Sequence, residues 1–497
     1  MHLTILLQFK VQCQSTHHET IVHFDLKGAP PRPGYFKQLL TVVSDLGADG
    51  VLIEWEDMFP YKGALERIKN GNAYSVDETL DILQHAHSLG LSVTPLVQSV
   101  GHLEWILKTK DFAHLRENTS FPMVACIGDD ETQDLILDSI HQVISLHSKI
   151  RMSSIHIGAD EVFQMGQCDA DREVLPLKYG NNTKRLVFDY IRTVATNITT
   201  SFPKSEVLMW YDELKNVERS LIKEYELDRL VTPVVWKYTT YLEKDLPPKM
   251  WEELASSFST VWGGSAFKGA DGPNRYWNRM KTYVQNNRQW YLQAEQYGEL
   301  FSNFHGFILT GWQRYDHFAS LCELMPVSMA SLAINLKIVK NFAVTENDAD
   351  LILQALKCPS ETTISQVISG EDKCHFAGYK VRDSIRDFML VKQQYENASW
   401  VHNREAAYLQ RSQIRLNASN PFYVDAVGRS YQRFIARLDK IMNQLEAAMN
   451  DIFFSDVFIE FSTDYIMPFY DELKQRLASV TAIDAQRTYR ARPWFRR

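Results

Sequence analysis

Long apolar runs, closely spaced cysteine pairs and an excess of basic residues are all missing from this sequence of 497 residues. No apolar stretch reaches the ~18 residues of a membrane-spanning helix, so we expect no membrane span. The formal net charge of −8 argues against a nucleic-acid partner, because phosphate contacts need a basic surface. A cluster of arginines near the C-terminus is interpreted as a solvated chain end: Arg487, Arg490, Arg492, Arg496 and Arg497.

The six cysteines are widely spaced and include no Cys-x-x-Cys pair. This spacing favours neither a zinc site nor a redox pair, and six cysteines in so long a chain do not indicate a disulfide scaffold. The GxGxxG fingerprint of dinucleotide-binding proteins is absent as well. We therefore expect no metal and no cofactor. The cysteines are Cys13, Cys126, Cys168, Cys322, Cys358 and Cys374.

The N-terminal segment and the glycosylation sequons give opposite indications about the compartment. Residues 3–9 are apolar but few, lack a basic n-region and are followed by Lys10, so they make a poor signal peptide. With so few cysteines, this favours the cytoplasm or the nucleus. Asn-x-Ser/Thr sequons favour the alternative of a secreted or lysosomal protein, although some arise by chance. They begin at Asn118, Asn181, Asn197, Asn397 and Asn417.

From residue 20 to about residue 340, short apolar runs alternate with longer amphipathic stretches. The runs are rich in Val, Ile and Leu, as parallel strands buried on both faces are. Eight strands separated by helices favour a (β/α)8 barrel of the α/β class, while a doubly wound sheet stays possible. We predict strands at 21–25, 50–54, 92–97, 153–158, 206–210, 232–236, 259–262 and 306–310, and helices at 35–46, 75–89, 134–146, 182–200 and 275–297.

The strand pattern stops near residue 341, and the remainder is typical of helices. We therefore predict an N-terminal extension (1–19), a catalytic barrel (20–340) and a helical C-terminal domain (341–497). The oligomeric state is not indicated, and a homodimer stays open. The predicted C-terminal helices are 349–356, 379–390, 401–413, 424–449 and 467–478.

Tryptophans recur where the predicted strands end, which is where functional side chains of such a barrel lie. The broad, weakly polar indole ring suits the apolar face of a sugar. Any one of them could instead fill the barrel core, but five on one rim beside carboxylates favour a sugar pocket. They are Trp55, Trp210, Trp236, Trp262 and Trp312.

Adjacent carboxylates, Asp160 and Glu161, follow the fourth predicted strand. Glycoside hydrolysis needs one carboxyl to protonate the leaving oxygen and a second group to manage the oxocarbenium charge. Neighbouring strand residues point to opposite faces, so at least one of the two must lie in the turn that follows. Desolvation and mutual repulsion there would raise a pKa. A surface dipeptide or a helix N-cap is the alternative interpretation, and the spacing alone does not decide.

The stretch from His156 to Glu161 resembles the His-x-Gly-Gly-Asp-Glu motif of glycoside hydrolase family 20, the β-N-acetylhexosaminidases, with Ala159 where most members have glycine. Gly101 and His102 are similar to the Pro-Gly-His turn of that family. Residues 23–30, 53–61 and 262–269 resemble the hexosaminidase D branch, whose members also favour an intracellular location. The similarity extends over roughly residues 20–340.

The resemblance implies an exo-acting, retaining glycoside hydrolase in which the substrate's own acetamido oxygen is the nucleophile, acting on glycans with a terminal N-acetylhexosamine. Asp160 would orient that amide, and Glu161 would serve as acid and then as base. Support for Glu161 is expected from His102 together with Glu56 or Asp57. The remaining candidate site residues are Asp25, His156, Trp210, Trp236, Trp262, Trp312 and Arg314.

Several family positions differ here. The first-strand arginine has no match, and Lys27 or His23 is the candidate substitute; the acetamido-contacting tyrosine falls on Gly269, which leaves Tyr211 or Tyr238 to supply a hydroxyl. The glutamate that reads the sugar's O4 is Arg314, which donates hydrogen bonds and cannot accept them.

With Arg314 paired to Asp316, we expect relaxed discrimination between GlcNAc and GalNAc. A catalytically silent sugar-binding barrel is the alternative function, and the intact Asp160–Glu161 pair argues against it. A chitinase-like barrel is disfavoured because its D-x-x-D-x-D-x-E signature is absent.

Overall fold

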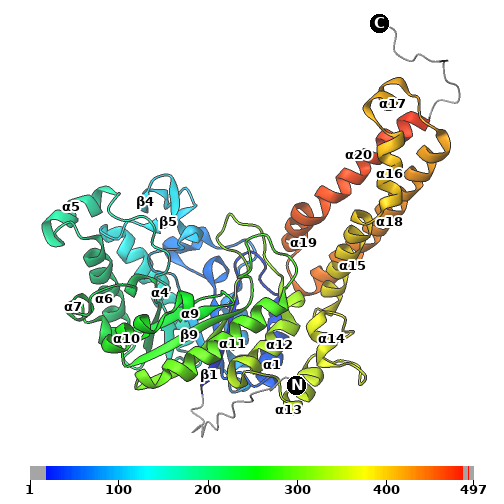
Figure 1. Ribbon diagram of the computed structural model, residues 1–497. Coiled ribbons are helices and arrows are strands. Elements are labelled where there is room, and N and C mark those ends of the chain that lie inside the picture. The colour runs from blue at the N-terminus through cyan, green and yellow to red at the C-terminus, as the bar shows by residue number, and fades with distance from the viewer. Residues whose placement is uncertain (1–17, 485–490, 492–497) are drawn as a thin grey trace, which may run out of the picture.

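The computed structural model describes residues 18–484 and Ala491, and a closed barrel of parallel strands lies at its centre (Figure 1). Within the described part, eight strands succeed one another around the barrel in chain order, and β10 closes it against β1. The predicted (β/α)8 fold is confirmed. The barrel strands are β1 (Glu19–Asp25), β2 (Gly50–Glu54), β3 (Ser92–Leu96), β6 (Ser154–His156), β7 (Glu206–Trp210), β8 (Thr232–Trp236), β9 (Thr260–Lys268) and β10 (Asn303–Gly311).

Each barrel strand buries both of its faces, which explains the continuous apolar runs of the sequence. On β2, Leu52 points into the barrel interior, while Val51 and Ile53 pack outward against the helices. The helices and short connecting elements around the barrel are α1 (Pro33–Asp45), α2 (Val76–Ser88), α3 (Glu104–Leu107), α4 (Asp130–His147), α5 (Asp169–Lys178), α6 (Thr183–Ser201), α7 (Arg219–Glu224), α8 (Leu227–Leu230), α9 (Leu242–Asp245), α10 (Pro248–Ser257), α11 (Met280–Tyr297) and α12 (Met325–Asn341), with a hairpin of β4 (Arg116–Asn118) and β5 (Phe121–Ala125).

Strand β9 is longer than predicted, because the pair Gly263–Gly264 belongs to the strand and not to a loop. A Cβ on Gly263 would crowd Trp290 and Phe307, and one on Gly264 would crowd Trp236. The glycines therefore allow close packing in the sheet, and the strand continues to Lys268. Trp262 consequently lies inside the strand and not at its carboxyl end.

Beyond α12 the described chain is helical, and four of its helices form a long projection away from the barrel, here called the arm: α15, α16, α18 and α20 (Figure 1). A fully buried seam of Ile385, Leu438, Leu445 and Leu473 holds the arm together. That residues 341–497 form an independent domain stays a prediction. The elements are α13 (Glu346–Ala355), α14 (Ile364–Ser369), α15 (Tyr379–Glu396), α16 (Ser399–Tyr408), α17 (Arg411–Leu416), α18 (Pro421–Ile452), α19 (Ser455–Phe461) and α20 (Met467–Asp484).

Two disulfides join four of the six cysteines, which the composition did not indicate. Cys126 pairs with Cys168 and Cys358 with Cys374, at sequence separations of 42 and 16 that carry no recognisable motif. The predicted N-terminal extension up to residue 17, with Cys13, and the arginine cluster lie outside the described residues. No helix among those described is both long and apolar enough to cross a membrane.

Candidate active site

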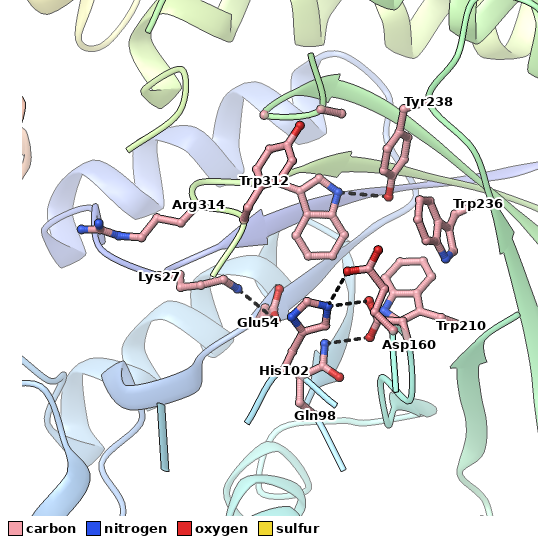
Figure 2. A pocket seen from close by; sticks show the side chains of 14 residues that line it. Lys27, Glu54, Gln98, His102, Asp160, Trp210, Trp236, Tyr238, Trp312 and Arg314 are labelled. Carbon is pink, nitrogen blue, oxygen red and sulfur yellow. Dashed lines mark hydrogen bonds and ion pairs between the residues drawn. The ribbon is translucent and has the colours of Figure 1, made fainter. Parts of the chain in front are cut away.

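A pocket of about 280 Å³ opens at the carboxyl ends of the barrel strands (Figure 2). This is slightly below the ~300–1,000 Å³ range of ligand pockets, a size for one sugar ring and not for a long chain. Its walls come from the carboxyl ends of all eight barrel strands or from the loops that follow them. The lining residues are Lys27, Glu54, Gln98, His102, Asp160, Glu161, Trp210, Trp236, Tyr238, Gly269, Ala270, Trp312, Arg314 and Tyr315.

The chain turns sharply after β6, and this turn brings both candidate acids into the pocket. Gly158, Ala159 and Glu161 have φ angles of 66°, 64° and 48°, in the left-handed region that favours glycine. Alanine tolerates this conformation at a modest cost, so the departure from the family's glycine keeps the same turn. Because the chain has left the strand, Asp160 and Glu161 escape its alternation and both line the pocket.

Gly101 and His102 lie against this turn. A Cβ on Gly101 would collide with the carbonyl oxygen of Asp160, so only glycine allows the two segments to approach so closely. His102, with a φ of 50°, places its Nε2 3.5 Å from a carboxylate oxygen of Asp160 and 3.3 Å from one of Glu161. The structure thus brings three predicted site residues together.

The two acids differ in their surroundings. Burial raises the pKa of Asp160, which is only 6% exposed and accepts a hydrogen bond from Gln98 Nε2 at 3.1 Å. The Glu161 side chain is 38% exposed. Glu161 can therefore exchange protons with water and a leaving group, while Asp160 is held in a fixed position.

His102 is charged at neutral pH. Burial opposes its charge, but Asp160, Glu161 and Glu104 outweigh that effect and raise the pKa of His102 to about 10. Of these acids, Glu104 comes two residues after His102 and was not among the predicted supporting acids, which were Glu56 and Asp57. Burial raises the pKa of Glu104 itself to about 7.

Glu56 and Asp57 lie behind the pocket, because the chain turns away from the barrel axis after β2. Glu56 contacts Lys27 Nζ at 2.9 Å and His317 Nε2 at 2.5 Å. Asp57 lies 4.0 Å from its nearest cation, Lys108 Nζ. Neither carboxylate lines the pocket.

Asp25 holds together two of the loops that form the pocket rim. Its carboxylate accepts backbone N–H bonds from Lys27 at 2.9 Å and from Gln313 at 2.7 Å, joining the loops after β1 and β10. This holds Lys27, whose Nζ lies 3.3 Å from Glu54 Oε1. Lys27 and Glu54 both line the pocket, and Glu54 was overlooked although it ends a predicted strand.

Three of the five predicted tryptophans wall the pocket: Trp210, Trp236 and Trp312 (Figure 2). The Trp236 indole donates to Asp212 Oδ2 at 2.6 Å, and the Trp312 indole donates to the Tyr238 hydroxyl at 3.0 Å. Of the two tyrosines proposed to replace the family's tyrosine, Tyr238 lines the pocket and Tyr211 does not. Tyr315 is a further lining hydroxyl.

The other predicted members of the tryptophan rim lie elsewhere. Trp55 alternates with Glu54, points outward to the helices and donates to His147 Nε2 at 2.9 Å. Trp262 fills the barrel interior and stacks on His305, with ring centroids 4.4 Å apart. Placing these two on the pocket rim was therefore wrong, for reasons of strand parity and strand length.

His156 supports the turn after β6 from inside the barrel. It is fully buried, its Nδ1 accepts the Gly158 N–H at 3.0 Å, and its ring lies 4.3 Å from that of Trp210. Burial lowers the pKa of His156 to about 3, so the ring is neutral. Its position is that of a structural support beneath the pocket.

Arg314 turns away from the pocket centre (Figure 2). Its two terminal nitrogens each lie 2.5 Å from the Glu460 carboxylate of α19, and Nη1 also donates to the Ala319 carbonyl at 2.8 Å. Asp316, its expected partner, instead accepts the backbone N–H groups of Phe318 and Ala319. The expected Arg314–Asp316 pair is therefore wrong, and the partner comes from 146 residues further along the chain.

A parallel barrel whose pocket joins adjacent carboxylates to a tryptophan wall places the chain among the glycoside hydrolases. A scan against profiles of known protein families finds no match. The chain is 32% identical to Hexosaminidase D of Homo sapiens over 472 residues, covering 94% of this chain and 95% of that protein. It is 38% identical to Hexosaminidase D of Bos taurus over 328 residues, covering 66% and 93%. The chain belongs to the hexosaminidase D family.

Solved structures agree on the fold. A crystal structure of a β-N-acetylhexosaminidase superposes with a TM-score of 0.50 at 9% identity, covering 73% of this chain and 81% of that one. At this identity the likeness shows the shared barrel architecture and no more.

Proposed function

We propose that this chain is an exo-acting β-N-acetylhexosaminidase, which removes terminal β-linked GalNAc or GlcNAc from glycoconjugates with retention of configuration. The observation that carries the proposal is the turn after β6, which directs Asp160 and Glu161 into a pocket sized for one sugar. Membership of the hexosaminidase D family supports the same substrate class.

The geometry suits a substrate-assisted reaction. The acetamido carbonyl oxygen would attack C1 while the bond from C1 to the leaving oxygen breaks, and Glu161 would protonate that oxygen. Asp160 would accept the acetamido N–H and stabilise the oxazolinium ion. Glu161 would then take a proton from water, which opens the ring of the intermediate. Ordinary retaining enzymes use a second, nucleophilic carboxylate about 5–5.5 Å from the acid. In this scheme the substrate takes the place of that carboxylate.

A matched pair of substrates tests the reaction. We expect the protein to hydrolyse an aryl N-acetyl-β-hexosaminide but not the aryl glycoside with a 2-hydroxyl in place of the acetamido group. A thiazoline mimic of the bicyclic intermediate should bind far more tightly than the free sugar. Turnover of the 2-hydroxy substrate, or a glycosyl-enzyme trapped on Asp160, would contradict the scheme. No turnover of either substrate would favour the sugar-binding alternative.

We propose further that the pocket accepts N-acetylgalactosaminides at least as well as N-acetylglucosaminides. Arg314 occupies the O4-reading position without offering an acceptor, and its guanidinium is held by Glu460. Apart from the Asp160, Glu161 and His102 group, the pocket lining offers a donor, Lys27, and an acceptor, Glu54, which together can serve either C4 epimer. We expect the two kcat/KM values to lie within about tenfold of each other or to favour the galactosaminide. A larger preference for the glucosaminide would contradict this.

The disulfides and the exposed sequons favour a different compartment from the one expected from the N-terminal segment. The weak signal sequence favoured the cytoplasm or the nucleus, but two disulfides are typical of oxidising compartments. Two of the sequon asparagines, Asn181 and Asn397, are exposed and open to glycosylation. We therefore propose the secretory pathway as the site of action. Mass spectrometry of the native protein should find N-glycans on these asparagines, and fully reduced, unglycosylated protein would favour the original expectation.

A further inference from the structure

Four side chains with metal-binding atoms meet beside the loop that carries the catalytic acids. Glu117 belongs to β4, Cys126 follows β5, and Cys168 and Asp171 begin α5. Their ligand atoms all lie within 4.8 Å of one another, and the two cysteines form a disulfide. The segment from Glu161 to Cys168 connects the catalytic turn directly to this cluster.

The two carboxylates of the cluster lack a cationic partner. Glu117 is 1% exposed and Asp171 is fully buried, and no Lys, Arg or His of residues 18–484 forms an ion pair with either. Glu117 accepts the Gln167 N–H at 2.5 Å, and Asp171 accepts the Gly128 N–H at 2.7 Å. The second Glu117 oxygen, Oε2, meets no N–H donor among the described residues.

The two buried carboxyl groups have oxygens within 4.8 Å of each other, and like charges at such a distance repel. A buried acid pair of this kind is costly unless it is protonated or coordinates a metal.

We propose that these four side chains bind a divalent cation of the zinc class when the Cys126–Cys168 disulfide is reduced. A dithiol reductant would supply two electrons and two protons, breaking the S–S bond to give two thiols and becoming a disulfide itself. The cation would then bind the two sulfurs as thiolates together with the two carboxylates, and the thiol protons would pass to solvent. Tetrahedral zinc with bonds of ~2.0–2.3 Å places its ligands roughly 3.3–3.8 Å apart, and the ligand atoms of this cluster all lie within 4.8 Å, so the two sulfurs would have to separate once their bond is broken.

The surrounding backbone favours the charged ligands. Cys168 is the N-cap of α5, a helix of 10 residues, and its sulfur accepts the Asp171 N–H at 3.4 Å. A helix N-terminus stabilises a thiolate. The N–H groups of Gly128 and Gln167 would orient the carboxylates, as outer partners of metal ligands do. A bound cation would thus keep the loop after β6 anchored whenever a reductant has opened the Cys126–Cys168 disulfide. The wide spacing of the cysteines hid this arrangement from sequence analysis.

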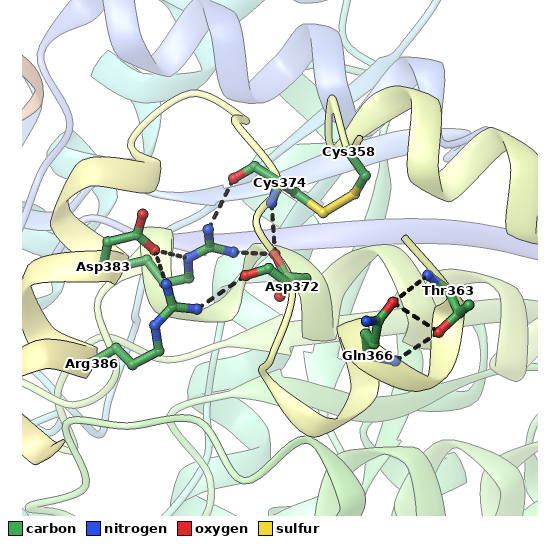
Figure 3. Close-up of a disulfide and its surroundings, with 8 residues drawn as sticks. Cys358, Thr363, Gln366, Asp372, Cys374, Asp383 and Arg386 are labelled. Atoms are coloured by element: carbon green, nitrogen blue, oxygen red, sulfur yellow. Dashed lines mark hydrogen bonds and ion pairs between the residues drawn. A yellow bond between two sulfur atoms is a disulfide. The ribbon is translucent and has the colours of Figure 1, made fainter. Parts of the chain in front are cut away.

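The second disulfide is a natural control (Figure 3). Asp372 lies near Cys374, but it is already bound to Arg382 Nη1 at 2.5 Å and accepts the Cys374 N–H at 3.1 Å. No other group of potential metal ligands like the first cluster occurs among the described residues. Reduction of Cys358–Cys374 should therefore create no metal site.

Cobalt binding to the full-length protein tests the proposal. After reduction and anaerobic desalting, the wild type should bind one cobalt ion, with the thiolate charge-transfer band and the visible bands of tetrahedral cobalt. The oxidised protein and the C126S/C168S variant should lack these bands, whereas C358S/C374S should keep them. Glu117→Gln should weaken binding by roughly tenfold or more. Cobalt without a thiolate band, or equal bands in C126S/C168S, would overturn the proposal.

A second measurement needs no variant. Zinc added to the reduced wild type should protect Cys126 and Cys168 from alkylation and leave Cys358 and Cys374 reactive, as mass spectrometry of the labelled peptides would show. Equal labelling of all four cysteines in the presence of zinc would refute the site. Hydrolytic activity is not part of either readout, so the outcome does not depend on the proposed function.

Discussion

The pocket rim and the arm are held in shape by opposite means. Ten non-glycine residues of the described chain have positive φ angles, and four of them lie in the pocket or directly behind it: Glu56, His102, Ala159 and Glu161. Within the arm and its connecting helices, residues 379–484, the one such residue is Asn417, which ends α17. The candidate site thus holds four of the ten strained residues of the described chain, and such strain is common at functional sites.

Charged residues are also distributed differently between the pocket rim and the arm. The rim buries charged groups such as Lys27 and Glu54. The arm buries an apolar seam and, apart from the buried Arg382–Asp372 pair at the start of α15, keeps ion pairs such as Arg429–Asp425 exposed. Burial of apolar surface stabilises the arm, and the rest of the barrel must offset the cost of the rim. Substitutions on the rim should consequently cost activity, and those in the arm should cost stability.

The largest effect is expected from Glu161→Gln. General acid catalysis typically contributes ~10² to 10⁴-fold, so kcat/KM should fall by that order with a poor leaving group and much less with an activated one. The unfolding temperature should hardly change, because the Glu161 side chain is partly exposed. Steady-state kinetics with two aryl glycosides provide the measurement. Near-normal turnover of both by the folded variant would remove Glu161 from its role.

Leu445→Ala should have the opposite profile. Leu445 is fully buried in the arm seam, and truncation of such a leucine typically costs about 2–5 kcal/mol. We expect a lower unfolding transition with kcat/KM unchanged. A separate early transition for the arm would also support the predicted C-terminal domain. If kcat/KM of the variant fell together with its stability, the pocket would depend on the arm, and the expected separation of the two regions would be wrong.

The difference between the arm and the pocket rim also explains which features could be predicted from the sequence. Helix α18 (Pro421–Ile452) was predicted at 424–449, because apolar residues at helical spacing make its buried seam visible. Short continuous apolar runs, separated by amphipathic stretches, likewise predicted all eight barrel strands. Asp160 and Glu161 were found through a motif. The sequence could not show that left-handed backbone angles in the turn after β6 direct both side chains into the pocket.

Apart from Trp55, which was misplaced by the local parity of its strand, the errors arose where long-range contacts decide. Whether Trp262 is a rim or a core residue depends on how far β9 continues past two glycines. The partner of Arg314, Glu460, belongs to a helix whose position no local pattern specifies. Both disulfides join segments that only the fold brings together. Residues whose roles rest on such contacts are the ones that the analysis of the sequence missed.

Gly101→Ala should damage the site through its geometry alone. The new methyl group would push against the Asp160 carbonyl, and a displacement of about 1 Å at a catalytic group can cost ~10²-fold in rate. Gly34→Ala is the matched control, because a Cβ at that position of α1 meets no atom within 4 Å. We expect kcat to fall in the first variant and to stay unchanged in the second. Equal kinetics in both would show that the turn is less tightly packed than it looks.

Glu104 should leave a signature in the pH dependence of stability. Burial raises the pKa of Glu104 to about 7, so between roughly pH 4.5 and 7 the native state holds a proton that the unfolded chain has released. This contribution to stability is therefore present at acidic pH and is lost as the pH rises through about 7. Chemical denaturation at several pH values should show a shallower decline for Glu104→Gln than for the wild type. Parallel pH profiles would contradict the assignment.

The smallest effect on catalysis is expected from the ion pair between Arg314 of the pocket rim and Glu460 of α19. Arg314 lines the pocket, yet its guanidinium is held by Glu460 of α19, at the base of the arm. A partly exposed but bidentate pair contributes up to about 1 kcal/mol, so Glu460→Gln should release Arg314 and shift KM by roughly fivefold or less with little change in kcat. Asp425→Asn is the control, because it breaks an exposed ion pair within the arm and should leave KM unaltered. If the Glu460→Gln and Asp425→Asn variants gave the same KM as the wild type, the arm would be without influence on the pocket, and the separation of the two regions would be complete.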